Sequence, residues 1–465
     1  MRVLLLSTNR EQSPFPVSPI GALSVSAAAR AAGHDVGFLD LAFQAAPQAA
    51  IRRALRTSRW DVIGVSIRNL DNCFYSQPKS YYHEVKQCID TIRQSSDAPV
   101  VLGGSGFSVE PEGWMTRLKA DYGVVGEGER AFVALLERIG AGQPSDDIQG
   151  VVQADGEKNG TKPAEAFHDL DDFARPLHGQ CRYRRYVRRG GYVSIQSKRG
   201  CPFKCIYCVY PQLEGEAYRL RSPEGVVEEI RAVVDSQGVR EFFFVDSVFN
   251  SPREQAMAVC REIIRAEISV RWMACCNPVG FDGELAHAMV RAGCIGVEFG
   301  LDAVTEKMIS VLEKPFSQEE IAMSLKAAAA AKLPCAVHLL FGGPMETIED
   351  VVRSREFLAS CPTPKAVFAS VGIRIYPRTA LERIARSEGV LSSQADLFDP
   401  AYYVSTGLGD DPMRAVDTVA RCRAEWSTAT DWMRPIMRVI QKVVNRFGIR
   451  PQWRDIQNYG KHMRR

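Results

Sequence analysis

The chain has 465 residues, of which 46% are hydrophobic and 24% are charged. This length exceeds what one hydrophobic core usually supports, so we expect a globular protein with two or three domains. The net charge of +3 is too small to indicate a nucleic-acid partner, and the longest apolar runs are only as long as strands. The sequence therefore predicts neither nucleic-acid binding nor a membrane span.

Thirteen cysteines are scattered through the chain, and the N-terminus runs directly into a strand-like pattern rather than a signal peptide. An odd number of thiols in such a chain favours reduced cysteines plus one metal site over a disulfide framework. We therefore expect a cytoplasmic protein. The segment from Arg421 onward is locally basic, and we interpret its regularly spaced cations as an exposed helix face.

Residues 1–145 alternate short apolar runs with amphipathic patterns. This βα order predicts a parallel sheet with helices on both faces, a doubly wound (Rossmann-like) domain whose ligand lies beyond the carboxyl ends of the strands. The loops at those ends are rich in glycine, which permits close approach of a ligand but also serves ordinary turns. The expected strands are 3–8, 36–41, 62–67, 100–103 and 122–125, and the expected helices are 20–32, 49–56, 82–93 and 129–139.

The rest of the chain divides into three further segments. Residues 146–190 are polar and irregular and predict a linker with small β elements. Residues 191–385 form a second βα series whose six strands predict a partial, TIM-like (β/α)6 barrel. Residues 386–465 predict a helical extension that caps the barrel or closes over a substrate. The six expected strands are 192–197, 241–246, 270–275, 296–299, 336–341 and 369–375.

Three cysteines, Cys201, Cys205 and Cys208, lie on one short loop directly after the first strand of the second series. A closed zinc site needs four protein ligands, whereas a [4Fe-4S] cube held by three cysteines leaves one iron free to bind a small molecule. No ligand follows at zinc-finger spacing, because the next cysteine is Cys260. The pattern favours an iron–sulfur cluster, with a zinc site as the alternative.

Polar residues and glycines at the ends of the later strands are expected near this loop, because barrel enzymes gather their functional groups there. Asp246 would cap the next helix or contact a ligand. Glu298 would point into the barrel, where a carboxylate needs a ligand or a salt-bridge partner. Gly342 and Gly343 would let the chain pass close to a ligand, and Arg374 would bind an anion or pair within the protein.

Four other residues on the predicted strands invite functional interpretations that we do not adopt. Cys275 and Cys276 end the third strand, and buried cysteine usually behaves as a small hydrophobic residue. Trp272 and His338 also lie within strands. We interpret all four as core residues.

The run from Cys201 to Cys208 resembles the signature loop of the radical SAM superfamily. The resemblance implies that the open iron binds the amine and carboxylate of S-adenosylmethionine (SAM). The turn after Phe341 resembles the family's Gly-Pro-Gly-Glu-Thr turn, although Met345 replaces the usual glycine. The SAM contacts that the resemblance implies are Tyr207, Asp246, Glu298, Gly342, Gly343 and Arg374.

The loops of the first domain resemble the cobalamin-binding domain of B12-dependent radical SAM enzymes. The Asp-x-His-x-x-Gly motif, whose histidine ligates cobalt in the wider B12-binding family, is missing. The resemblance places Arg68 against the lower face of the corrin, where a cation would disfavour a lower ligand; pairing of Arg68 with Asp71 is the alternative. The implied cobalamin-binding residues are Arg68, Asn69, Gly103, Gly104, Ser105, Gly126 and Glu127.

Together these resemblances imply a cobalamin-dependent radical SAM methyltransferase. Such an enzyme moves a methyl group from SAM, through methylcobalamin, to an unactivated carbon of a small-molecule or carrier-bound substrate, and needs an external flavodoxin- or ferredoxin-type reductant. One alternative is a B12-dependent cyclisation or rearrangement. Others are a radical SAM enzyme whose first domain has lost cobalamin, and an iron–sulfur redox sensor.

Overall fold

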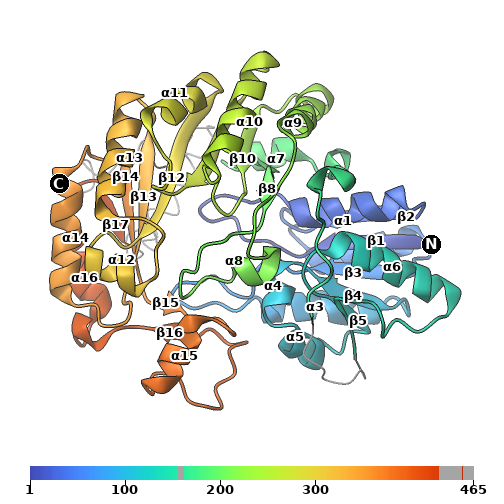
Figure 1. Ribbon diagram of the computed structural model, residues 1–465. Helices are drawn as coiled ribbons and strands as arrows, with labels where there is room; N and C mark the ends of the chain where they lie inside the picture. The colour runs from blue at the N-terminus through green and yellow to red at the C-terminus, as the bar shows by residue number, and fades with distance from the viewer. Residues whose placement is uncertain (155–161, 429–452, 454–465) are drawn as a thin grey trace.

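The structure is a computed structural model that describes residues 1–154, 162–428 and 453. These residues form two sheets, each with helices packed against it, and the two units lie side by side with α8 (Tyr210–Glu214) between them (Figure 1). The predicted helical segment beyond residue 428 lies outside the described residues, except for Trp453. No helix in the described ranges has both the length and the apolar character needed to cross a membrane.

The N-terminal sheet has the strand order β2-β1-β3-β4-β5-β6, with the first five strands parallel and β6 antiparallel. This is the predicted doubly wound fold. Its strands are β1 (Arg2–Ser7), β2 (Asp35–Asp40), β3 (Val62–Ser66), β4 (Val100–Gly103), β5 (Tyr122–Val124) and β6 (Val151–Gln153). Its helices are α1 (Ile20–Ala31), α2 (Pro47–Thr57), α3 (Tyr82–Arg93), α4 (Ser105–Val109), α5 (Pro111–Leu118) and α6 (Gly128–Ala141).

Both faces of this sheet are buried because successive strand residues point to opposite sides. Leu4 and Leu6 of β1 pack in a core with α2, α3 and α5. Val3 and Leu5 of the same strand pack in a second core with α1 and α6. The near-continuous apolar strands of the sequence therefore follow from helices that cover both faces.

The second sheet is the barrel, with the parallel order β17-β14-β13-β12-β11-β10-β7. Six of its strands are the predicted ones, and β17, from the C-terminal extension, adds a seventh. The strands are β7 (Val193–Ile195), β10 (Glu241–Phe244), β11 (Arg271–Cys276), β12 (Cys294–Asp302), β13 (Cys335–Phe341), β14 (Ala366–Val371) and β17 (Trp426–Thr428).

Helices cover the outside of the barrel (Figure 1). The longer ones are α9 (Pro223–Gln237), α10 (Arg253–Arg265), α11 (Gly283–Arg291), α13 (Gln318–Ala330), α14 (Ile348–Ser360) and α16 (Pro412–Ala420). The shorter ones are α7 (Tyr183–Val187), α12 (Glu306–Val311) and α15 (Ala380–Ser387). Two short antiparallel pairs complete the unit: β8 (Lys198–Arg199) with β9 (Arg219–Leu220), and β15 (Ile373–Arg374) with β16 (Tyr402–Tyr403).

The lumen of the barrel has an apolar end and a polar end. Tyr192, Met273, Ala336 and Trp453 form a separate core near the start of the strands. Further along β12 the polar residues begin, and the pairing of β12 with β13 shifts register before Asp302, which has a φ of +59°. Such irregularities are common beside active sites, where they redirect a side chain. The polar end of the lumen faces the cysteine loop.

Candidate active site

The cysteine loop is held by backbone contacts on both sides. The amide of Cys201 donates to the carbonyl of Gly215 (3.0 Å), and the amide of Cys208 donates to that of Cys205 (3.0 Å). Gly200, just before the loop, has a φ of +91°. A Cβ atom at this position would lie 2.0 Å from the carbonyl oxygen of Ala217, so only glycine fits there.

We expect Gly200→Ala to reduce the iron content of the purified protein, because the loop must shift to remove this contact. Gly215→Ala is a matched control, since Gly215 also has a positive φ (+89°) but a Cβ at that position would have no neighbouring atom within 4 Å. The general strain of a side chain at positive φ, about 1–3 kcal/mol, is common to both variants. Iron analysis and denaturant unfolding of the two variants would separate the effect of crowding from that of backbone strain. Equal losses of iron and of stability in the two variants would show that crowding at Gly200 does not matter.

Tyr207, between two of the cysteines, belongs to a buried polar network. Its hydroxyl donates to Asp302 at the end of β12, and Lys314 lies 2.6 Å from the same carboxylate. Burial alone would raise the pKa of Asp302, but Lys314 and Tyr207 outweigh it and hold this pKa below its ordinary value. The loop that carries the cysteines is thus attached to the barrel by a charged pair beside it.

Glu298 points into the lumen, as predicted, and has two partners there. The indole N–H of Trp453 donates to Oε1 (3.0 Å), and Nε2 of His338 lies 3.3 Å from Oε2. Burial would raise the pKa of Glu298, but His338 holds it below its usual range. The imidazole of His338 packs against the ring of Phe368 in a tilted arrangement, with 4.9 Å between the ring centroids.

The cysteine loop is also attached to the N-terminal domain, through Arg199. Its guanidinium lies 2.6 Å from Glu129 and 3.0 Å from Glu127, and Arg219 also pairs with Glu127. Arg199 is 7% exposed, Glu127 8% and Glu129 3%, so water screens these charges little. Glu127, which the resemblance assigned to cobalamin, is therefore engaged by two arginines of the barrel unit.

A second interdomain ion pair joins Arg374 to Asp71, with 2.7 Å between Nε and the carboxylate. The same guanidinium donates to the carbonyls of Ile375 and Leu397 and is buried. This is the structural pairing that the sequence left open for Arg374. It also removes Asp71 as a partner for Arg68.

Three other residues with predicted SAM contacts form hydrogen bonds within the protein itself. Asp246 is buried and accepts from the amide and hydroxyl of Ser197, and Lys198 lies 3.6 Å away. The amides of Gly342 and Gly343 both donate to the carboxylate of Glu346. Asp246 therefore does not cap the next helix, which begins after Pro252, and its carboxylate pairs with Ser197 and Lys198.

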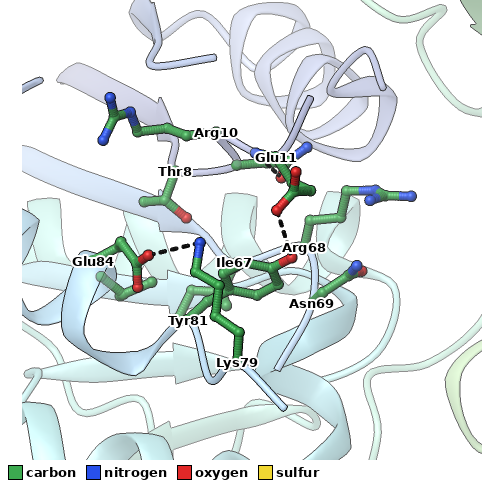
Figure 2. A pocket seen from close by; sticks show the side chains of 11 residues that line it. Thr8, Arg10, Glu11, Ile67, Arg68, Asn69, Lys79, Tyr81 and Glu84 are labelled. Atoms are coloured by element: carbon green, nitrogen blue, oxygen red, sulfur yellow. Dashed lines mark hydrogen bonds and ion pairs between the residues drawn. The ribbon is translucent and has the colours of Figure 1, made fainter. Parts of the chain in front are cut away.

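The N-terminal domain has a cavity of about 200 Å³ at the carboxyl ends of β1 and β3, the point where the strand order reverses (Figure 2). Doubly wound domains bind ligands at this position. Tyr81 donates to Glu11 across the cavity (3.3 Å), and Lys79 pairs with Glu84 (3.0 Å). Arg68 and Asn69 complete one wall.

Arg68 is the one predicted cobalamin residue with an uncommitted charge. Its guanidinium has no ion pair or hydrogen bond with any described residue, and Figure 2 shows it directed away from Tyr81 and Glu11. It is exposed, and the protein around it lowers its pKa, chiefly through desolvation. Tyr210 of α8 is close enough to act on that pKa. The uncommitted positive charge of Arg68 would suit an anionic or electron-rich group bound next to it.

The predicted glycine loop after β4 is packed tightly against the loop after β3. A Cβ on Gly104, whose φ is +96°, would lie 2.5 Å from the carbonyl of Ile67, and the hydroxyl of Ser105 donates to the carbonyl of Arg68 (2.6 Å). Gly103 ends β4, and Gly126 has a φ of +84° in the turn before α6. These residues fix the loop that carries Arg68.

The donor set fits a cluster better than a single ion. In the ranges that the structure describes, no three His, Cys, Asp or Glu side chains converge as one metal ion requires. The three loop cysteines are free thiols, and on a cube each would bind a different iron.

The comparisons with known proteins agree with this arrangement. Residues 195–358 match the Radical SAM superfamily, and residues 7–136 match the B12 binding domain. Tryptophan 2-C-methyltransferase of Streptomyces laurentii is 27% identical over 81% of this chain and 73% of its own length. Hopanoid C-3 methylase of Methylococcus capsulatus is 29% identical over 54% of this chain and 47% of its own.

The fold is also that of a solved structure. The radical S-adenosylmethionine methyltransferase TsrM from Kitasatospora setae, with cobalamin and a [4Fe-4S] cluster bound, superposes with a TM-score of 0.85. The alignment has 23% sequence identity and covers 100% of this chain and 98% of that one. At this identity the likeness concerns the fold.

A doubly wound domain facing a barrel with an open three-cysteine loop defines a class of iron–sulfur enzymes that work with a second cofactor. The chain belongs to the cobalamin-dependent radical SAM enzymes. Its cofactors are accordingly a [4Fe-4S] cluster, SAM and cobalamin. The two relatives named above are methyltransferases, which agrees with the function predicted from the cysteine loop and the first domain, and more distant relatives include cyclases.

Sequence reasoning missed the residues that connect these parts. Lys314 and Arg199 carried no motif, and His338 was interpreted as a core residue. The alternation of β13 places His338 on the lumen side, next to Ala336 and Leu340, and this signal could have been used. Nothing local to Trp453 indicated its hydrogen bond to Glu298.

Proposed function

We propose that this protein transfers a methyl group from SAM to a carbon atom of a small organic substrate bound in the barrel lumen. One contact supports the proposal: helix α8 packs against helix α4. Helix α8 begins two residues after Cys208, and helix α4 begins directly after Gly104. The loop for the cluster and the loop for the corrin thus meet. When bound, the three cofactors supply the electron, the radical chemistry and the methyl group.

The chain's own residues position and enclose the reactants. Cys201, Cys205 and Cys208 would hold the cluster, and the network of Tyr207, Asp302 and Lys314 fixes that loop. Tyr207, Glu298, Gly342 and Gly343 remain our candidates for contacts to SAM because they lie around the same end of the barrel. For Asp246 and Arg374 we propose structural roles instead, since both are buried and paired.

On the corrin side we propose that Arg68 lies against the lower face, with Asn69, Gly103, Gly104, Ser105 and Gly126 shaping the pocket. The guanidinium of Arg68 has no ion pair or hydrogen bond with any described residue, which supports this role, because a cation there would stabilise an electron-rich, reduced corrin. For Glu127 the ion pairs with Arg199 and Arg219 favour an interdomain role. We further propose a flavodoxin- or ferredoxin-type electron donor, a cytoplasmic location, and no nucleic-acid or membrane partner.

The test is a methyl-transfer assay under strict exclusion of oxygen, with reconstituted enzyme, a chemical reductant and SAM labelled with deuterium in its methyl group. L-tryptophan is the first substrate to try, because the relative from Streptomyces laurentii is named for it. We expect a product that carries one labelled methyl group on carbon. Consumption of a substrate without gain of the label would instead support a cyclisation or rearrangement.

A further inference from the structure

One polar side chain in the middle of the lumen has no role among the contacts proposed for the cluster, SAM and cobalamin. His338 lies on β13, between Glu298 of β12 and Phe368 of β14, and the strand register pairs it directly with Phe368. Its side chain is 42% exposed, although the strand on which it lies is central in the sheet. The exposed part of the ring must therefore face the lumen.

The neighbour of His338 favours the protonated form of its ring. Glu298 is 14% exposed, and a carboxylate removed from water needs a cation or strong donors. Among the described residues His338 is the only ionisable partner of Glu298, and the indole of Trp453 is the other donor. Burial lowers the pKa of His338, but the carboxylates of Glu298 and Asp302 raise it above its ordinary value, and Glu298 has the larger effect of the two.

The other charges near the ring do not cancel this effect. Asp302 on β12 also favours the imidazolium, but Lys314 neutralises it at 2.6 Å. On the β14 side the ring meets the uncharged face of Phe368. His338 thus lies between a carboxylate that favours its protonated form and an aromatic wall.

One nitrogen of the His338 ring is available to a ligand. Nε2 is buried and directed at Glu298, whereas Nδ1 has no hydrogen bond with any described residue and is not enclosed. Two neighbours of His338, Phe368 on the adjacent strand and Leu340 two residues along β13, are apolar and partly exposed. A donor that protrudes from an apolar wall suits a molecule with one acidic group and an apolar body.

We propose that His338, oriented by Glu298, binds a carboxylate of the substrate through Nδ1–H, so that the substrates are small carboxylic acids with an apolar or aromatic body. This inference rests on the proposed function, since it concerns what occupies the lumen beside SAM. SAM also carries a carboxylate, and the resemblance places that group on the cluster. The test therefore has to distinguish these two sources of a carboxylate.

Carbethoxylation with diethyl pyrocarbonate measures how reactive the His338 side chain is. Peptide mass spectrometry gives the modified fraction in the reconstituted holoenzyme, and no turnover is needed. The reagent attacks neutral imidazole, so we expect the reaction at His338 to rise with pH through a midpoint above that of free histidine, about 6.5. Benzoate should protect His338 and benzamide, its uncharged analogue, should not. L-tryptophan and tryptamine form a second pair of the same kind.

Glu298→Gln should lower the midpoint and weaken benzoate binding by roughly 10- to 150-fold, the range of one charge-assisted hydrogen bond. His287→Gln, on the outside of the barrel where His287 is exposed, is the matched control and should change neither. His338→Gln should remove the modified peptide and leave the labelling of the other histidines unchanged, which shows that the variant folds.

Three results would overturn the inference. They are equal protection by benzoate and benzamide, protection by SAM alone with no added effect of benzoate, and absence of reaction at His338 at pH 8 while other histidines react. Failure of the proposed function looks different, because methyl transfer would then be absent while the protection by benzoate remained.

Discussion

Cys205→Ala is expected to abolish iron binding and SAM cleavage while leaving corrin binding intact. A cube held by two cysteines lacks one of its three protein ligands, and the remaining iron sites become open to solvent. The corrin loops belong to the other sheet, whose cores do not include Cys205. Iron analysis, the visible spectrum of the corrin and the release of 5′-deoxyadenosine measure the three quantities separately.

The matched control is Cys422→Ala, because Cys422 is an exposed free thiol away from the loop. It should retain iron, corrin and SAM cleavage. If Cys205→Ala lost the corrin together with the iron, the two units would not hold their cofactors independently. The domain boundary that we place near residues 146–190 would then be contradicted.

Arg199→Met is expected to lower the free energy of unfolding by about 3–5 kcal/mol, the usual cost of removing one partner from a buried ion pair. The substitution leaves Glu127 and Glu129 buried beside an apolar side chain, with Arg219 still paired to Glu127. Since these carboxylates lie in the N-terminal domain, we also expect weaker attachment of that domain to the barrel. Denaturant unfolding would measure the first effect and limited proteolysis the second.

Arg253→Met is the control, because Arg253 also pairs with two carboxylates, Asp282 and Glu284, but these are exposed. Exposed ion pairs contribute about 0–1 kcal/mol, so little change is expected. A loss for Arg199→Met no larger than that of the control would mean that water reaches the interdomain cluster. The ion pairs would then not hold the two domains together.

The parts of the site that could be predicted from the sequence are those whose residues are neighbours in the chain. The cysteine loop is one segment, so its spacing alone indicated the cluster, and the family match confirmed the class. The βα order predicted both sheets for a similar reason, because local periodicity determines which faces are buried. Strand alternation also predicted that the side chain of Glu298 points into the lumen.

What could not be predicted is which partner each charged side chain takes. Arg374 and Asp71 are 303 residues apart in the chain, and no local pattern indicates that they meet. Asp246 and Glu127 lie at strand ends where ligands are expected, yet both are used by the protein's own donors. Strand β17 was missed because its three residues join the barrel from within a predicted helical extension.

The specific boundaries between the domains and the individual contacts to SAM and cobalamin stay predictions. Arg68 is the residue whose position favours a ligand role most, since its guanidinium has no ion pair or hydrogen bond with any described residue, whereas Tyr207 and Glu298 also have partners within the barrel. The interdomain pairs of Arg199 and Arg374 give the space between the domains a fixed shape. Both kinds of residue are needed if two cofactors are to meet one substrate.

The most direct test of methyl transfer through cobalamin is the iron and cobalamin content of the full chain, produced without oxygen and with B12 supplied. We predict one corrin and about four irons per chain, the number that a single cube requires. The same iron without corrin would contradict the role of the N-terminal domain, and with it the transfer of a methyl group through cobalamin.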